Sequence, residues 1–224
     1  MGTTIKLTAS DGHNLTAYRA DPVGAPLGTV VVVQEIFGVN SHIRSVADGY
    51  ADAGYRAIAP ALFDRISPDM ELGYDSEDIE RGREAAFPLG WDVPLTDIDA
   101  AIAAADTDKV GIVGYCWGGS LAYLAACESK VNCAVGYYGG QILKILAAKP
   151  ELQLKAPAML HFGEHDHGIP LTDVEQIKQR HPDIPVHLYD AGHGFNCDQR
   201  GSYSEDSSKQ ALDRTLEFFK THLG

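Results

Sequence analysis

One segment of the sequence presents a cysteine in a setting suited to attack on a carbonyl group. Gly114-Tyr115-Cys116-Trp117-Gly118 follows a short apolar run and precedes a helical pattern. It has the G-x-S-x-G form of a nucleophile elbow, a sharp strand-to-helix turn, with cysteine in place of serine. The start of such a helix directs N–H groups at the reacting oxygen and favours a thiolate. The segment therefore predicts a nucleophilic Cys116, although a glycine-rich packing turn around a buried cysteine would give the same pattern.

An acid and a histidine that could complete a catalytic triad follow later in the chain. Asp166 lies a few residues after the apolar run 158–162, and His193 a few residues after the run 186–189. The order nucleophile, acid, histidine is that of the α/β-hydrolases. His193 would take the thiol proton and later protonate the leaving group, while Asp166 would hold the imidazole in the required tautomer. Taken singly, Asp166 could cap the following helix and His193 could be an ordinary loop residue.

A glutamate follows the most apolar run of the sequence, in Gln34-Glu35-Ile36-Phe37-Gly38. At that position Glu35 would lie beside the elbow, where its carboxylate could hold or accept the thiol proton. The N–H of Trp117 would be one oxyanion donor and that of Ile36 the second, and one such donor lowers the barrier by about 3–4 kcal/mol. The alternative is that Glu35 is a solvated acid in a loop.

The remaining histidines and cysteines do not predict a metal site. His165 and His167 flank Asp166 and could point the same way, but no further ligand cluster is evident and the triad already uses the aspartate. None of the cysteines is paired in a CxxC motif, and the chain holds four of them: Cys116, Cys127, Cys133 and Cys197. We therefore expect no metal and no cofactor, and free thiols in a reducing compartment.

The elements that must position these residues are short apolar runs that alternate with amphipathic segments. The runs expected as strands are 29–33, 55–59, 110–113, 133–137, 158–162 and 186–189. The segments expected as helices are 41–53, 77–87, 94–105, 117–127 and 171–180, with a last helix through Leu212 and Leu223. The unbroken β-branched run 29–33 is typical of a strand covered on both faces.

This alternation predicts an α/β protein with the α/β-hydrolase fold. The turn Ser10-Asp11-Gly12 separates residues 5–8 from residues 15–19, which should pair as an N-terminal antiparallel hairpin. The rest should form a mostly parallel central sheet with helices on both faces. Sites in such sheets lie at the carboxyl ends of the strands. The length suits a single domain over residues 1–224.

The charge and hydropathy of the chain limit the classes of partner that it could bind. A net charge of −13 argues against nucleic acid and against an anionic membrane surface, but a few local arginines could still bind a small anionic substrate. The first residues lack the apolar core of a signal peptide, and no apolar run approaches the roughly 20 residues of a membrane helix. We expect a cytoplasmic protein that is a monomer or a small homo-oligomer.

Three segments together resemble the dienelactone hydrolases, also called carboxymethylenebutenolidases. The segments are 34–40, 113–119 and 191–195, and the resemblance extends over nearly the whole chain. It implies a carboxylic-ester hydrolase with a Cys116–His193–Asp166 triad. It further implies that Glu35 pairs with the resting thiol and moves when substrate binds, which releases a thiolate. The substrate implied is an anionic lactone, 4-carboxymethylene-but-2-en-4-olide, which is opened to maleylacetate through a thioester acyl-enzyme.

The resemblance also points to residues that would bind the substrate. Arg83 is a better match than Arg81 to an arginine that holds the substrate carboxylate, although Arg81 could equally be a solvated surface arginine. Tyr137 matches a tyrosine of the pocket. Phe87 falls where a tyrosine is common, so this sequence lacks one hydroxyl contact there.

A second arginine of the family is expected where this sequence has Cys197. Arg200 could take its place from farther along the loop, or could be a solvated surface arginine. Because these substrate contacts depart from the family pattern, a general carboxylesterase of the same fold is the main alternative. A non-catalytic binding or redox-sensing protein is a further alternative, which the complete set of Cys116, Asp166 and His193 disfavours.

Overall fold

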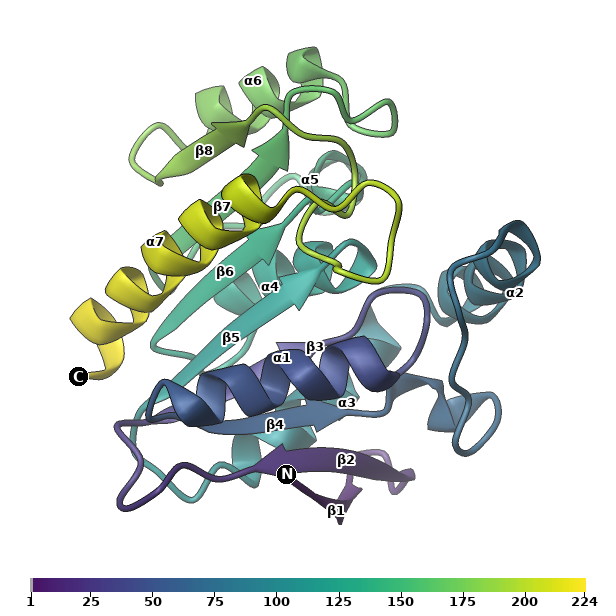
Figure 1. The fold of residues 1–224 in the computed structure, drawn as a ribbon, viewed down its shortest axis with the longest axis vertical. Coiled ribbons are helices and arrows are strands. Elements are labelled where there is room, and N and C mark those ends of the chain that lie inside the picture. The colour runs from purple at the N-terminus through teal and green to yellow at the C-terminus, as the bar shows by residue number, and fades with distance from the viewer. Residues whose placement is uncertain (1) are drawn as a thin grey trace.

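The centre of the molecule is one eight-stranded sheet (Figure 1). The structure is a computed structural model that describes residues 2–224. The strand order is β1-β2-β4-β3-β5-β6-β7-β8. Strands β1 (Thr3–Thr8) and β2 (Asn14–Ala20) form an antiparallel hairpin, and β2 pairs antiparallel with β4. The other pairs are parallel, so the predicted mostly parallel sheet led by a hairpin is confirmed.

The parallel strands follow the apolar runs of the sequence. They are β3 (Thr29–Val33), β4 (Arg56–Pro60), β5 (Val110–Tyr115), β6 (Cys133–Tyr137), β7 (Ala158–Gly163) and β8 (Val186–Tyr189). Every residue of β3, β5, β6 and β7 is buried, as continuous hydrophobic runs in a doubly covered sheet require. Only one residue of β8 is buried, because this strand is the edge of the sheet.

Helices cover both faces of the sheet (Figure 1). One face carries α1 (Ser41–Asp52) and α7 (Glu205–Leu223). The other carries α3 (Asp92–Ala103), α4 (Trp117–Glu128), α5 (Ile142–Ala148) and α6 (Leu171–Arg180). Helix α2 (Ser76–Ala86) projects beyond the sheet on the side toward which the parallel strands run, between the short 3-10 turns Leu62–Arg65 and Phe87–Leu89. None of the described helices is long and apolar enough to cross a membrane.

The structure differs from the sequence-based expectation at a few elements. Helix α5 was not predicted, because its seven residues are too few to show a helical period and only Ile142 and Ile145 are buried. Helix α3 begins at Asp92, so its Pro94 is the third helical residue rather than the first. In α7 the buried positions recur every four residues from Ala211 to Leu223, which leaves Leu212 exposed.

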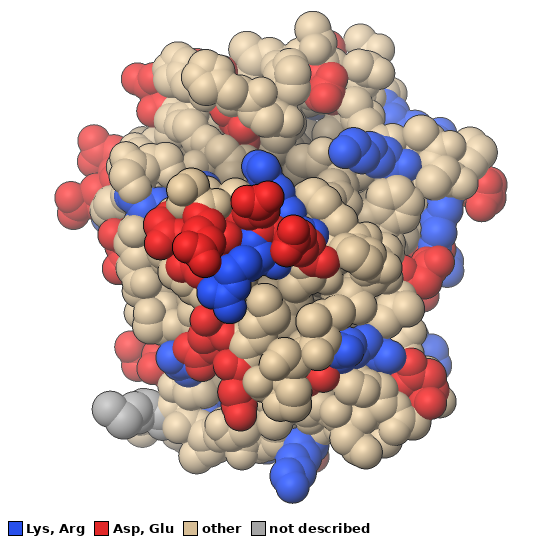
Figure 2. Space-filling model, turned by 90° about the vertical axis from the view of Figure 1, so that its right-hand side faces the viewer, with Lys and Arg blue, Asp and Glu red and all other residues tan. Residues whose placement is uncertain are grey.

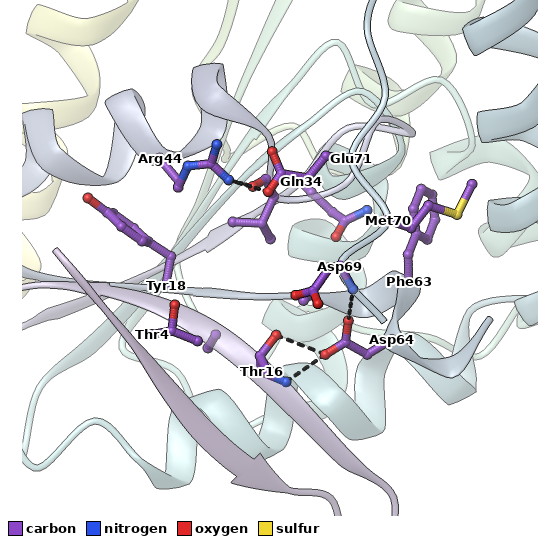
Figure 3. Close-up of a pocket in the computed structure, with 13 residues that line it drawn as sticks. Thr4, Thr16, Tyr18, Gln34, Arg44, Phe63, Asp64, Asp69, Met70 and Glu71 are labelled. Atoms are coloured by element: carbon purple, nitrogen blue, oxygen red, sulfur yellow. Dashed lines mark hydrogen bonds and ion pairs between the residues drawn. The ribbon is translucent and has the colours of Figure 1, made fainter. Parts of the chain in front are cut away.

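A small cavity lies between the hairpin and the loops that follow β3 and β4 (Figure 3). Its volume is about 80 Å³, and none of the triad residues lines it. Asp64 accepts hydrogen bonds there from the N–H and the hydroxyl of Thr16, at 2.7 and 2.8 Å. Arg44 donates to Glu71 at 2.6 Å on the opposite wall. Since these charged groups are already paired, we interpret the cavity as part of the packing between the hairpin and the loops.

Candidate active site

The cysteine of the elbow occupies a backbone conformation that few side-chain-bearing residues adopt. Cys116 joins β5 to α4 with φ 55° and ψ −115°. The turn is tight enough that a Cβ atom on Gly114 would overlap the carbonyl of Gly118. A Cβ atom on Gly118 would in turn overlap backbone carbonyls at the end of β3. The two glycines of the motif are therefore required for the helix to start this close to the sheet.

The cysteine, histidine and aspartate predicted as a triad form one connected chain of hydrogen bonds. His193 Nε2 lies 3.1 Å from Cys116 Sγ, and His193 Nδ1 lies 2.6 Å from Asp166 Oδ2. The Asp166 side chain is buried, and its other oxygen accepts the N–H of Gly168 at 2.8 Å. A carboxylate held this way fixes the imidazole with Nδ1 protonated, which leaves Nε2 to exchange a proton with the sulfur.

The electrostatics of His193 favour its protonated form beside the sulfur. Burial lowers the pKa of His193, but a charged Cys116 sulfur and the hydrogen bond that His193 donates to Asp166 raise it, and the net pKa is about 10. An imidazole of this pKa keeps a proton at neutral pH when the neighbouring sulfur is negative. The arrangement can therefore stabilise a thiolate–imidazolium pair, which is the reactive form of a cysteine nucleophile.

Glu35 is buried beside the triad, and its bonded partner is Arg200. Arg200 Nη1 lies 3.2 Å from Glu35 Oε1, so the guanidinium compensates a carboxylate that is only 1% exposed. Burial lowers the pKa of Arg200, but Glu35 raises it above its usual value. The guanidinium also lies over the rings of Phe37 and Tyr74, at 5.7 and 6.0 Å. The sequence led us to expect a contact of Glu35 with the thiol of Cys116, and here the pairing with Arg200 takes its place.

The sequence-based candidates for oxyanion donors are the backbone N–H groups of Trp117 and Ile36. Trp117 is the first residue of α4, and Ile36 follows Glu35 in the loop after β3. Across residues 2–224, neither N–H donates a hydrogen bond to another protein group. The loop is held from outside by α2, where a Cβ atom on Gly82 would overlap the carbonyl of Ile36.

The two arginines on α2 and the phenylalanine of the turn that follows it, all predicted to bind substrate, lie at the surface. Arg81 and Arg83 are exposed, and Arg81 pairs with Asp78 at 3.3 Å. Phe87 is 52% exposed. Figure 2 views the molecule from the side on which α2 projects, and acidic and basic side chains intermingle on that face. Within the described chain, none of the three side chains bonds to the triad, to Glu35 or to Arg200.

Two consecutive tyrosines at the end of β6 have different surroundings. The hydroxyl of Tyr137 bonds to Thr215 of α7 at 2.7 Å, so it points into the helix layer. Tyr138 has φ 39°, and its ring lies 5.1 Å from that of His193. Its hydroxyl is buried without a hydrogen-bond partner in the described residues. Tyr138 is therefore the tyrosine that borders the triad, and its position at the carboxyl end of a strand was the available indication.

The structure also groups side chains that could hold a metal ion. Glu35, His42 and Cys197 each offer a ligand atom, and these atoms lie within 4.8 Å of one another. His165 and His167 are exposed, and His165 bonds to Asp190 at 2.6 Å. The sequence did not single out His42, because Cys197 and Asp198 lie more than 150 residues away along the chain.

The fold and the order of these residues define a class of protein. Cys116 has a positive φ and lies between a parallel strand and a helix, and Asp166 and His193 follow later strands. This is the arrangement of an α/β-hydrolase. The family model of the dienelactone hydrolase family matches residues 15–223. The chain therefore belongs to the dienelactone hydrolase family, as the resemblance of its motifs indicated.

Similar proteins cover almost the entire chain. The carboxymethylenebutenolidase of Pseudomonas putida is 38% identical over 228 residues, which are 96% of this chain and 94% of its own. Carboxymethylenebutenolidase 1 of Cupriavidus pinatubonensis is 30% identical over 95% of this chain and 94% of its own. A crystal structure from Klebsiella pneumoniae subsp. pneumoniae has a TM-score of 0.81 at 31% identity, over 98% of this chain and 99% of that one.

Proposed function

We propose that this chain is a cysteine-dependent hydrolase that opens a lactone or an activated ester through a thioester acyl-enzyme. Membership of the dienelactone hydrolase family suggests lactone hydrolysis, and the similar proteins from Pseudomonas putida and Cupriavidus pinatubonensis are named carboxymethylenebutenolidases. The observation that carries the finer proposal is the distance of 3.1 Å between Cys116 Sγ and His193 Nε2, with Asp166 2.6 Å from the other ring nitrogen.

In the proposed first step, the Cys116 sulfur attacks the carbonyl carbon of the lactone and a C–S bond forms. The oxygen becomes negative, and the N–H groups of Ile36 and Trp117 stabilise it. When the tetrahedral intermediate collapses, the ring C–O bond breaks. The protonated His193 donates its Nε2 proton to the oxygen that leaves. The product of this step is a thioester that carries the opened ring.

In the proposed second step, water hydrolyses the thioester. His193 takes a proton from the water as it attacks, and a C–O bond forms at the acyl carbon. The C–S bond then breaks, and the free acid leaves. Cys116 departs as a thiolate beside the imidazolium of His193, which restores the starting pair. Asp166 keeps the same ring nitrogen protonated throughout.

We assign Glu35 the control of the thiol proton. Its carboxylate is buried beside the triad, one oxygen is bonded to Arg200, and the other has no partner among residues 2–224. If an anionic substrate draws Arg200 away, the carboxylate loses its compensating charge and gains affinity for a proton. We propose that Glu35 then takes the proton of the Cys116 thiol and passes it to His193 Nε2, so substrate binding would itself produce the thiolate–imidazolium pair with which the first step begins.

We propose that the substrate is anionic, with 4-carboxymethylene-but-2-en-4-olide as the first choice and maleylacetate as its product. Arg200 supports this choice, because a guanidinium beside the triad can bind a carboxylate bidentately. Arg83 and Arg81 are exposed on α2 and would contribute only if the bound lactone extends to that helix.

Replacement of the nucleophile tests the proposed chemistry. Cys116→Ala should lower kcat for dienelactone by at least about 10³-fold, because a triad acts as a unit. Cys127→Ala, a buried cysteine on α4, is the matched control and should keep its turnover. A trapped thioester in mass spectrometry would support the mechanism. Turnover by Cys116→Ala at the rate of the unsubstituted protein would contradict it.

A general carboxylesterase is the second candidate, favoured by the exposed positions of Arg81 and Arg83. The two candidates differ in their preference for charge. A dienelactone hydrolase should have a kcat/KM for dienelactone at least tenfold above that for a neutral aryl ester, and Arg200→Gln should reduce that preference. Equal values for both substrates, with the same loss in the variant, would favour the esterase.

A further inference from the structure

Three potential metal ligands from distant parts of the chain meet in the interior next to the triad. Glu35 comes from the loop after β3, His42 from the first turn of α1, and Cys197 from the loop between β8 and α7. All three are buried, with exposures of 0%, 3% and 0%. Glu35 Oε2 or Oε1, a His42 ring nitrogen and Cys197 Sγ lie within 4.8 Å of one another.

Two of these side chains carry buried polar atoms without a partner. His42 Nε2 and Glu35 Oε2 make no hydrogen bond to any residue that the structure describes. An unsatisfied buried polar group costs about 1–3 kcal/mol. Such groups are rare in folded proteins. Two unpaired polar atoms at the same site indicate a ligand that would pair with both.

The hydrogen bond made by the other ring nitrogen of His42, Nδ1, determines that Nε2 can act as an electron-pair donor to a ligand. Nδ1 lies 3.0 Å from Oδ1 of Asp198, a carboxylate at the surface. Because a carboxylate can only accept, Nδ1 carries the proton and donates it. Nε2 of the neutral ring then presents a bare lone pair to the interior. A histidine that ligates a metal almost always donates its other ring N–H to a carboxylate, a backbone carbonyl or a water molecule, and Asp198 is such a carboxylate.

We propose that Glu35, His42 and Cys197 bind a transition-metal ion of the Zn²⁺ type. A carboxylate oxygen, an imidazole nitrogen and a sulfur are the donors that Zn²⁺ takes in proteins. Ca²⁺ and Mg²⁺ prefer a shell of oxygen ligands, of which this set provides only the Glu35 carboxylate. The Sγ–H bond of Cys197 breaks as the Sγ–metal bond forms, and the proton passes to solvent. The three protein ligands leave one position for a water molecule.

The charges of the site suit a divalent cation. The thiolate of Cys197 and the carboxylates of Glu35 and Asp198 supply three negative charges. Arg200 beside Glu35 supplies one positive charge, so two negative charges remain to balance the ion. Ligand atoms about 2.0–2.3 Å from a tetrahedral zinc ion lie about 3.5 Å apart, so the site must contract by about 1 Å. The sequence-based expectation of no metal site relied on local spacing, which cannot reveal ligands at positions 35, 42 and 197.

One residue, Glu35, takes part in both the proposed metal site and the proposed reaction. A metal ion bound to Glu35 would prevent this carboxylate from accepting the thiol proton, so Zn²⁺ should inhibit lactone hydrolysis. This consequence rests on the proposed function, whereas the binding of the ion does not. Binding and inhibition are therefore measured separately.

The binding test uses the full chain with Cys116→Ser, which removes the thiol of the triad as a competing ligand. Co²⁺ replaces Zn²⁺ as a spectroscopic probe, and we expect one Co²⁺ per chain with a thiolate-to-metal absorption band. Cys197→Ser in this background should abolish the band, and His42→Ala should weaken binding at least about tenfold. Cys133→Ala, a cysteine buried elsewhere in the sheet, should leave both unchanged.

A surface variant keeps the test decisive if the buried variants fold poorly. Asp198 is exposed, and Asp198→Ala should weaken Zn²⁺ binding about 10–100-fold by releasing the His42 ring. Equilibrium dialysis that finds no bound ion, or a thiolate band that survives Cys197→Ser, would overturn the proposal. So would an Asp198→Ala protein with unchanged affinity. Because these readouts do not require turnover, they stand even if the protein hydrolyses no lactone.

Discussion

Two buried polar clusters flank the end of β6, and they are satisfied to different degrees. The Thr215 cluster consists of Tyr137, His161, Tyr189 and Thr215. The hydroxyl of Thr215 bonds to Tyr137 and His161, and the second ring nitrogen of His161 bonds to Tyr189. The Glu35 cluster consists of Glu35, His42, Tyr138, Cys197 and Arg200. Three of its buried polar atoms have no partner within the described part of the chain.

The difference separates groups that hold the fold together from groups that are available to a ligand. A closed network of hydrogen bonds recovers the cost of burying polar atoms and fixes how α7 packs on the sheet. The unpaired atoms of the Glu35 cluster leave that cost uncompensated. We infer that the protein tolerates them because a substrate, a proton or an ion completes the cluster. Each prediction below perturbs one cluster and uses the other as its reference.

The largest expected effect on stability comes from the ion pair of the Glu35 cluster. Arg200→Leu leaves the Glu35 carboxylate buried without a compensating charge, which should lower the free energy of unfolding by about 3–5 kcal/mol. Glu35→Gln in the same chain removes that charge and should restore most of the loss. Urea unfolding at neutral pH measures both variants, and a double variant as unstable as Arg200→Leu would contradict this interpretation.

The next effect tests the Thr215 cluster. Thr215→Val keeps the shape of the side chain but leaves Tyr137 and His161 without their shared partner. We expect a loss of about 2–3 kcal/mol in unfolding free energy with little change in kcat. Thr221→Val, at an exposed position of the same helix, is the matched control and should cost less than about 0.5 kcal/mol. A large fall in kcat with unchanged stability would place Thr215 in the functional cluster instead.

The pH dependence of stability reports the same cluster through His161. Burial lowers the pKa of His161 well below 6.5, with further lowering by His187 and Arg214. Below pH 6.5, His161 therefore binds a proton in the unfolded chain but stays neutral in the folded chain. The contribution of His161 to stability is complete above pH 6.5 and is lost as the pH falls, by up to about 1.4 kcal/mol per pH unit. Urea midpoints between pH 5 and 7 should show a flatter slope in His161→Gln, and an unaltered slope would count against this account.

The smallest effect compares the two neighbouring tyrosines directly. Tyr137→Phe removes a bonded hydroxyl and should cost about 1 kcal/mol. Tyr138→Phe removes a buried hydroxyl that no described residue satisfies, so it should leave stability unchanged or raise it by about 1 kcal/mol. We expect kcat/KM for dienelactone to fall only in Tyr138→Phe. Equal losses of stability in the two variants would erase the distinction between the clusters.

The parts that could be predicted from the sequence are those with a local pattern. The elbow around Cys116 is a five-residue motif, and unbroken apolar runs identify the buried strands. Because parallel strands end at one edge of the sheet, the residues that follow them, including Asp166 and His193, are brought together by topology alone. The observed triad distances follow from this arrangement.

The parts that could not be predicted depend on side-chain direction or on long-range contact. Tyr137 and Tyr138 are adjacent and of one type, and only the left-handed backbone of Tyr138 turns its ring toward His193. The meeting of His42 with Cys197 joins positions more than 150 residues apart, which no local spacing reveals. The pairing of Glu35 with Arg200 depends in the same way on how the loop before α7 folds back.

The separation of the triad along the chain has a consequence during synthesis. The nucleophile and the histidine are 77 residues apart, and the histidine is made later. A ribosome that adds roughly 5–20 residues per second needs about 4–15 s to cover that distance. During this interval the nascent chain carries its cysteine without the imidazole that we propose activates it. Under the proposed mechanism, the new polypeptide therefore gains hydrolase activity only after the segment that follows β8 has emerged and packed against the rest of the chain.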